Sequence, residues 1–402
     1  MELYNFQKKA IEDICADKYI VCMDVGTGKS AVMMRWLKAQ KPKKVLIVTT
    51  PSKRDSGDFL RDADTWNGAL WREKLKSFEI ISWHGLSKWV VQHKDTLDDY
   101  DYAFDEVQKA KAGVSSGMGK AFLNITGRTS CWAGFTATPG DNWLHFYPYF
   151  TACKFVKNKT EFMRNFAITQ TFKGFPEIIG WSNEGVLKKW WDSISTTPDT
   201  SQMFRELPSE THTVVKFKKP SGYDKLRKTR TTEDGEFLDS TMGLCHALRE
   251  MSFTKEKKQW LEDFIESLGT QAVIFYNYIE EGDTIEGIIK KVKKGAKVWR
   301  IDGKHHEIPT ADTIGKYDIV LCQWQSGSEA LNLQFINYWV SVTPTYSYIT
   351  STQARGRIKR IGQQRPMFFY YLKCEGIETA VYDALKSKKD FSEENYLNKK
   401  GE

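Results

Sequence analysis

The stretch Asp24-Val-Gly-Thr-Gly-Lys-Ser30 follows an apolar run at residues 19–23. Closely spaced glycines let the backbone bend so that its N–H groups face one point, and a following helix adds positive potential there. A lysine and a hydroxyl residue at the end of such a turn are typical of a loop that binds phosphates and magnesium. The full pattern G-x-x-x-x-G-K-[ST] is not met, because Met23 stands at its first glycine position. We predict a helix beginning around Lys29. The nucleotide-binding candidates in this loop are Gly26, Thr27, Gly28, Lys29 and Ser30.

A pair of carboxylates, Asp105 and Glu106, follows the strand-like segment 99–104. The end of a strand in an open α/β sheet is where such proteins bind ligands. We therefore predict that Asp105 and Ser30 hold Mg2+ and that Glu106 orients and deprotonates a water molecule. The alternative, a solvated acidic pair, is disfavoured by the apolar residues on both sides.

Near-continuous apolar runs recur along the chain, as in the strands of a parallel sheet covered on both faces. They predict the fold class α/β, with two tandem doubly wound parallel-sheet lobes and helical insertions. The expected strands are 19–24, 45–50, 80–82, 102–104 and 131–135 in the first lobe, and 272–276, 298–301, 318–322, 338–342 and 367–372 in the second.

The region from about 150 to 255 lacks these recurring apolar runs, so we expect helical insertions and a hinge there. The domains predicted are an ATP-binding lobe at 1–207, with a helical insertion at about 150–207, and a second lobe at 208–402, with a helical insertion at about 222–255. A chain of 402 residues is long enough for two such domains.

The composition is that of an ordinary globular protein, with 41% hydrophobic and 27% charged residues. The net charge of +8 is compatible with a polyanionic partner. No run of eighteen apolar residues and no basic, apolar leader occur, so we expect no membrane association and a cytoplasmic location. The seven cysteines form no Cys-x-x-Cys pair, which argues against a zinc cluster or a disulfide framework.

Two arginines near the C-terminus, Arg357 and Arg360, are spaced by about one helical turn. On one helix face, their guanidinium groups suit the role of neutralising charge on a transferred phosphoryl group. The alternative is a solvated basic helix, because Arg355, Lys359 and Arg365 lie nearby.

The ordered motifs resemble those of superfamily-2 helicases and translocases, and this resemblance implies that the two tandem lobes are RecA-like. The motifs are 24–30, Phe104-Asp-Glu-Val-Gln108, Gly134-Phe-Thr-Ala-Thr-Pro139, 326–334 and Gln353-Ala-Arg-Gly-Arg-Ile-Lys-Arg-Ile-Gly-Gln363. The last is similar to the final motif of Swi/Snf-type duplex-DNA translocases. A bare two-lobe form of this size would suit a bacterial or viral genome.

This resemblance implies ATP and Mg2+ as cofactors, with ATP closing a cleft between two lobes that together hold nucleic acid. It implies that Gln7 contacts the adenine and that Thr136 and Thr138 couple hydrolysis to lobe movement; Gln353 joins the nucleotide-binding candidates. The nucleic-acid candidates that it implies are Ser52, Lys53, Ser82, His84, Tyr276, Asn277, Ser326 and Ser328.

The sequence departs from the family pattern at two positions. Gln108 replaces a commoner histidine, and Ala330 stands where glycine is usual, which puts the rate rather than the activity in doubt. The run His305-His306-Glu307 lacks the spaced partners of a metal site and indicates a solvated turn instead.

The function expected is that of a DNA-dependent ATPase that moves on duplex or branched DNA and remodels forks or migrates junctions. We expect a monomer, with replication or recombination proteins as candidate partners. A strand-separating DNA or RNA–DNA helicase is the alternative, and a non-hydrolysing scaffold is disfavoured by the intact motifs. Unwinding requires a wedge, for which Trp181, Trp190 and Trp191 are candidates, although each is equally suited to a core.

Overall fold

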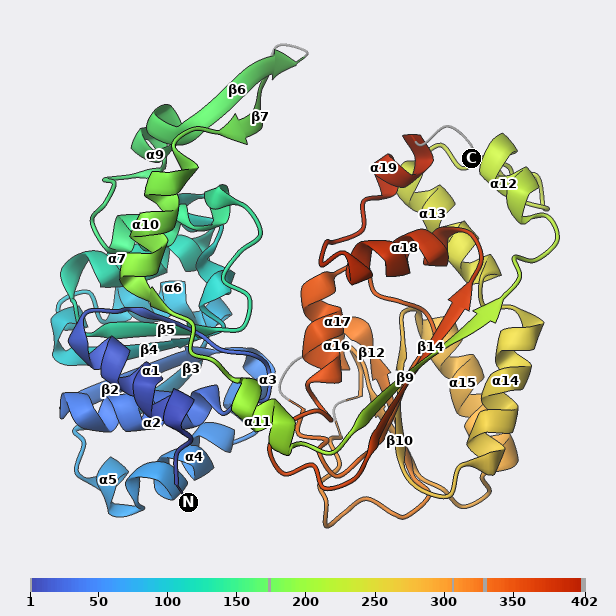
Figure 1. Ribbon diagram of the computed structural model, residues 1–402, viewed down its shortest axis with the longest axis horizontal. Coiled ribbons are helices and arrows are strands. Elements are labelled where there is room, and N and C mark those ends of the chain that lie inside the picture. The colour runs from blue at the N-terminus through green and yellow to red at the C-terminus, as the bar shows by residue number, and fades with distance from the viewer. Residues whose placement is uncertain (1, 173–174, 306, 328–330, 399–402) are drawn as a thin grey trace. The chain divides into compact units, whose positions relative to one another are not determined.

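The computed structural model describes residues 2–172, 175–305, 307–327 and 331–398. The chain forms two compact units, unit 1 (Met1–Phe204) and unit 2 (Arg205–Glu402). Each unit is built on a six-stranded sheet whose paired strands run parallel (Figure 1). The fold class expected from the sequence, α/β with two tandem RecA-like parallel-sheet lobes, is confirmed.

The sheet of unit 1 has the strand order β3-β2-β4-β5-β1-β8. Its inner strands are largely buried on both faces, which explains why most of their residues are apolar. Because the strands are parallel, the residues that follow β1, β2, β4 and β5 all emerge at one edge. The strands are β1 (Ile20–Cys22), β2 (Lys44–Thr49), β3 (Ser77–Ser82), β4 (Tyr100–Asp105), β5 (Trp132–Thr136) and β8 (Ser195–Thr196).

Helices cover both faces of this sheet. On one face Trp36 packs against Phe135 of β5, with ring centroids 6.3 Å apart. On the other, Trp83 lies 5.6 Å from Phe104 of β4. The helices of unit 1 are α1 (Asn5–Ala16), α2 (Lys29–Gln40), α3 (Pro51–Asp55), α4 (Asp58–Asn67), α5 (Leu70–Glu73), α6 (Trp83–Gln92), α7 (Gly117–Arg128), α8 (Tyr147–Ala152), α9 (Lys159–Phe166), α10 (Glu184–Ile194) and α11 (Ser201–Glu206).

The region expected to be a purely helical insertion contains strands as well. An antiparallel hairpin, β6 (Ala167–Phe172) and β7 (Phe175–Trp181), joins neither six-stranded sheet and projects from unit 1 beyond α9 and α10 (Figure 1). Strand β8 then returns to pair with β1. The expectation was wrong here because a hairpin that lacks a buried face shows no apolar run.

The tryptophans considered as wedges pack in the core of unit 1 instead. Trp190 stacks on Phe155 with centroids 4.9 Å apart, and Trp191 meets Phe146 at 4.7 Å. Trp181, at the base of the hairpin, lies 5.6 Å from the ring of Phe162.

The sheet of unit 2 has the strand order β11-β12-β10-β13-β14-β9. The edge strand β9 was not expected from the sequence, because most of its residues are exposed and it carries no apolar run. The strands are β9 (Glu210–Phe217), β10 (Ala272–Tyr276), β11 (Val298–Ile301), β12 (Ile319–Gln323), β13 (Tyr338–Ser341) and β14 (Met367–Cys374).

Alternate residues of β10 enter two separate cores. Ile274 packs with Leu261 and Ile285 on one face, while Phe275 packs with Trp324 on the other. No helix among the described residues is long and apolar enough to cross a membrane. The helices of unit 2 are α12 (Tyr223–Thr229), α13 (Thr241–Met251), α14 (Lys255–Ser267), α15 (Ile279–Val292), α16 (Trp324–Gly327), α17 (Tyr348–Arg355), α18 (Ile377–Lys386) and α19 (Glu393–Asn398).

A fully buried ion pair ties α14 to α18 in unit 2. The Nζ of Lys257 lies 2.9 Å from both carboxylate oxygens of Glu378 and donates to the carbonyl of Val342 at 2.8 Å. Glu378 also accepts the backbone N–H of Cys374. Burial raises the pKa of Glu378, and Lys257 counteracts that rise.

Replacing Lys257 by Met should therefore leave an uncompensated buried carboxylate and destabilise unit 2 by about 3–5 kcal/mol. Urea unfolding followed by tryptophan fluorescence measures this change. The double variant Lys257→Met, Glu378→Leu removes both charges and should recover most of the loss. If the single variant is as stable as the parent, the pair does not hold these elements together.

Candidate active site and nucleic-acid interface

The proposed phosphate-binding loop, residues 24–30, called the phosphate loop below, lies between β1 and the first turn of α2, and α2 begins at Lys29 as the sequence predicts. Gly28 caps α2 in the left-handed region, with φ +82°, a conformation that glycine adopts at little cost. The Nζ of Lys29 lies 3.1 Å from the carbonyl oxygens of Met23 and Asp24, folded back over the loop. The hydroxyl of Thr27 donates to the same Asp24 carbonyl at 2.7 Å. The start of α2 and its lysine are thus arranged around a turn that can receive phosphate.

Gln7 of α1 is joined directly to this loop. Its side-chain amide donates to the carbonyl of Thr27 at 2.9 Å, its oxygen accepts from the N–H of Tyr4, and only 1% of it is exposed. The structure therefore brings the proposed adenine-reading residue against the proposed phosphate-binding residues.

Asp105 ends β4 and is 1% exposed. Its Oδ2 accepts from the hydroxyl of Thr49 at 2.7 Å and lies 3.2 Å from the Nζ of Lys53. The same Nζ is 3.4 Å from the Oγ of Ser30. The two predicted magnesium ligands, Ser30 and Asp105, therefore face one point from adjoining segments of the sheet edge. The role of Thr49 was missed, although its position at the end of β2, beside β4, was the available signal.

The donor set at this point fits a magnesium ion. The second carboxylate oxygen of Asp105, Oδ1, is buried and accepts no hydrogen bond from any residue that the structure describes. A carboxylate and a hydroxyl are oxygen ligands of the kind that Mg2+ takes, usually together with water and phosphate oxygens.

Glu106 has a strained backbone, with φ +51°. Its carboxylate accepts from the amide of Gln108 at 2.5 Å, and the oxygen of that amide accepts from the hydroxyl of Thr136 at 2.7 Å. The Oγ1 of Thr136 in turn accepts the N–H of Thr138 at 2.9 Å. One hydrogen-bonded chain thus joins the proposed base to the proposed coupling motif. Gln108, noted in the sequence only as a departure, is its central link.

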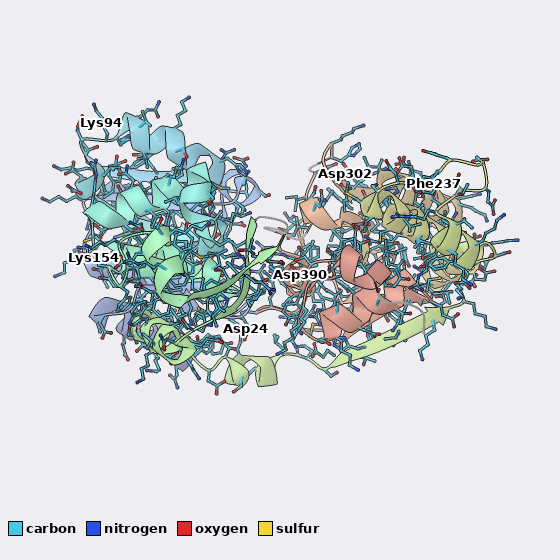
Figure 2. The ribbon with its side chains drawn as sticks, turned by 90° about the horizontal axis from the view of Figure 1, so that it is seen from above. Asp24, Lys94, Lys154, Phe237, Asp302 and Asp390 are labelled. Carbon is cyan, nitrogen blue, oxygen red and sulfur yellow. The ribbon has the colours of Figure 1, made fainter. Side chains whose placement is uncertain are left out.

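A second unexpected contact reaches the phosphate loop from the segment after β8. Thr200 is 6% exposed, and its hydroxyl donates to the carboxylate of Asp24 at 2.7 Å. Asp24 itself is exposed and is labelled in Figure 2. Residues far apart in the sequence therefore meet at the loop.

The nucleic-acid candidates of unit 1 differ in their exposure. Ser52 and His84 are exposed and available for contact. Ser82 is 5% exposed, and its hydroxyl caps α6 by accepting the N–H of Gly85. This placement does not support a nucleic-acid contact by Ser82. The side chain of Lys53 is only partly exposed, and its Nζ lies 3.2 Å from the carboxylate of Asp105.

The two arginines of unit 2 do not share a helix face, contrary to expectation. Helix α17 ends at Arg355, and residues 356–362 form turns. Gly362, with φ +97°, lies within these turns, where a helix cannot continue. Arg360 donates to the carbonyl of Leu331 at 3.3 Å and contacts Asn332, while the carbonyl of Arg357 accepts from Leu333. Turn contacts, and not helical spacing, position both residues.

The remaining candidates of unit 2 also differ in their exposure. Tyr276 is fully buried and its hydroxyl donates to Asp302 at 3.3 Å, so its placement does not support a surface contact. Asn277 and Ser326 are partly exposed. Gln353 is 7% exposed on α17. Ser328 and Ala330 lie outside the described residues.

His305 belongs to a turn organised by Asp302, which is labelled in Figure 2. Asp302 Oδ1 accepts the N–H groups of Lys304 and His305 and lies 2.9 Å from the ring of His305. Burial acts to raise the pKa of Asp302, but these hydrogen bonds and Arg300 outweigh it, and the pKa is lowered. Among the described residues no group of three His, Cys, Asp or Glu side chains could hold a metal; His306 lies outside them.

Residues 256–362 match the profile of the helicase conserved C-terminal domain. The matched residues lie within unit 2, and the match supports a helicase C-terminal domain there. This helicase domain contains Asn277, Ser326, Arg357 and Arg360, and it suggests a nucleic-acid-dependent ATPase of the helicase or translocase type. No curated protein matches the chain.

Removing the central amide of the hydrogen-bonded chain tests its role. Gln108→Ala should lower ATP turnover by roughly tenfold or more while leaving nucleotide binding intact, because a hydrogen bond to a charged group contributes about 1.5–3 kcal/mol. Steady-state hydrolysis and fluorescent-nucleotide titration measure the two quantities.

If Gln108 acts through Glu106, then Gln108→Ala should have little further effect in a Glu106→Gln background. Lys111→Ala, an exposed charge removal on the same segment, serves as the control. Independent, multiplicative losses in the double variant would contradict the proposed link.

Proposed function

We propose that this protein is a DNA translocase that hydrolyses ATP to move on duplex or branched DNA, and that it remodels forks or migrates junctions. The observation that carries the proposal is the convergence of the phosphate loop, Asp105 and the Glu106–Thr136 chain at one sheet edge of unit 1. The helicase C-terminal domain of unit 2 supports it independently.

Each residue at the sheet edge has a distinct task in this proposal. Lys29 neutralises the β- and γ-phosphates, and Ser30 and Asp105 hold Mg2+, which offsets charge on the phosphates. Glu106 orients and deprotonates the attacking water. The hydrogen bonds that run from Glu106 through Gln108 to Thr136 and Thr138 connect Glu106 to the backbone that follows β5.

Arg357 and Arg360 are proposed to neutralise charge on the transferred phosphoryl group. Guanidinium groups suit this task because their fixed N–H donors match phosphate oxygens. Arg360→Ala tests this role directly, since turnover should fall while DNA binding persists.

The preference for duplex DNA rests on the pattern Gln353-x-x-x-Arg357-x-x-Arg360-x-Gly362-Gln363, which resembles that of Swi/Snf-type translocases. In the structure Gln363 supports these turns, because its amide donates to the carbonyl of Ile336 at 2.8 Å. A motor that exchanges one base pair for another works against almost no net pairing energy.

The decisive measurement compares ATP turnover with single-stranded DNA, duplex DNA, forked DNA, a four-way junction and RNA. We expect stimulation by duplex and branched DNA, together with ATP-dependent migration of the junction. Lys29→Ala should reduce turnover to background with every substrate, because the phosphates lose their neutralising charge. Stimulation by RNA or single strands alone would overturn the preference for duplex DNA.

A second candidate function, strand separation, is favoured by the hairpin β6–β7. The hairpin stands outside the sheets, and its register pairs Phe172 with Phe175 at the end of the described strands. Ile168 and Ile179, on the two strands, are 45% and 59% exposed. An apolar projection of this kind could serve as a wedge in a duplex, where each step requires about 1.4 kcal/mol of stacking to be overcome.

The double substitution Phe172→Ser, Phe175→Ser separates the two functions. If the hairpin is a wedge, the variant should lose at least about tenfold in unwinding of a tailed duplex while DNA-stimulated ATP turnover is retained. Val91→Ser, at an exposed apolar position on another surface of unit 1, is the control. Equal unwinding by parent and variant would reject the wedge.

A further inference from the structure

The ammonium group of Lys53 lies where the proposed magnesium ion would bind. Its Nζ is 3.2 Å from Asp105 Oδ2 and 3.4 Å from Ser30 Oγ, the two proposed ligands. It also lies 4.4 Å from the ring centroid of Phe59, a fully buried side chain. Lys53 thus has two oxygen partners and an aromatic face, a set of contacts suited to a cation.

Lys53 compensates a charge that would otherwise be costly. Asp105 is 1% exposed, and the only other side-chain donor that the described residues provide to its carboxylate is the neutral hydroxyl of Thr49. A buried carboxylate without a counter-charge is strongly unfavourable. The ammonium group of Lys53 therefore stabilises the charged form of Asp105, the proposed metal ligand.

An ammonium group and a divalent ion cannot share these oxygens. Mg2+ binds oxygen ligands at about 2.0–2.1 Å and keeps a shell of water, so it requires the space that Nζ occupies. The two cations would also repel each other at a separation of a few ångströms.

We propose that Lys53 is a resident counter-ion of the magnesium site, which Mg2+ must displace when nucleotide binds. This inference rests on the proposed function and gives Lys53 a positioning role. Displacement frees a positive charge on α3, beside the exposed Ser52 and Arg54. The freed ammonium group then becomes available to a nucleic-acid phosphate, so magnesium–nucleotide and nucleic acid favour each other's binding, as linkage requires.

The first test measures thermal stability against Mg2+ concentration without nucleotide. Lys53→Met keeps the length of the side chain and its apolar contact with Phe59 but removes the charge. The variant should unfold at a lower temperature than the parent and should be stabilised by Mg2+ alone, while the parent responds little. Arg54→Met removes an exposed charge paired with Asp55 on the same helix and should behave as the parent.

The second test measures fluorescent-nucleotide binding at a series of Mg2+ concentrations without nucleic acid. Lys53→Met and Lys53→Gln should both reach half-maximal nucleotide binding at a roughly tenfold lower Mg2+ concentration. The reason is that each variant lacks the ammonium group that competes with Mg2+ for its oxygen ligands. An unchanged or higher Mg2+ requirement in both variants would refute the proposal. If neither parent nor variant binds nucleotide, the proposed function fails, while the thermal test still reports on Lys53.

The third test uses the parent protein alone. Acylation of Lys53 by an amine-reactive reagent, followed by mass spectrometry, should be slow without ligand and faster with Mg2+ and ADP, because the ammonium group is released. Lys111, an exposed lysine, provides the internal reference. Protection of Lys53 by Mg2+ and ADP would overturn the proposal.

Discussion

The carboxylate of Asp105 is almost completely buried, and a buried charge requires compensation. Three side chains lie around this carboxylate: Thr49 at the end of β2, Lys53 in the helix that follows β2, and Ser30 at the end of the phosphate loop. The parallel sheet makes this possible, because β2 and β4 are neighbours that end at the same edge. The geometry of the candidate site is thus a result of the strand order of unit 1.

The strands that carry the site could be predicted from the sequence because each is buried on both faces. The run that became β10 matches its predicted bounds, and α2 begins at Lys29 as expected. Strand β9 and the hairpin β6–β7 could not be found in this way, since their exposed residues need no apolar pattern. The prediction that Arg357 and Arg360 share a helix face was wrong because the backbone there forms turns, with Gly362 at a positive φ.

Side-chain partnerships were less predictable than strands. Nothing in the sequence indicates that Gln108 links Glu106 to Thr136, because the hydrogen bonds join residues from two different strand ends. The location of Lys53 is a similar case. The resemblance implies that Lys53 contacts nucleic acid, whereas in the structure its Nζ lies 3.2 Å from the buried carboxylate of Asp105. The need to compensate a buried charge determines where such a side chain lies, and the sequence does not reveal this need until the strand order is known.

The bond between Thr200 and Asp24 has a mechanical consequence. Thr200 belongs to the segment that leaves unit 1 through α11 and enters unit 2 at β9. Tension applied along this stretch of backbone therefore reaches the phosphate loop before it reaches the rest of the sheet. Conversely, a change in the loop that breaks the bond would release this segment from Asp24. A force on the connecting segment is therefore transmitted to the proposed phosphate-binding loop through a single hydrogen bond.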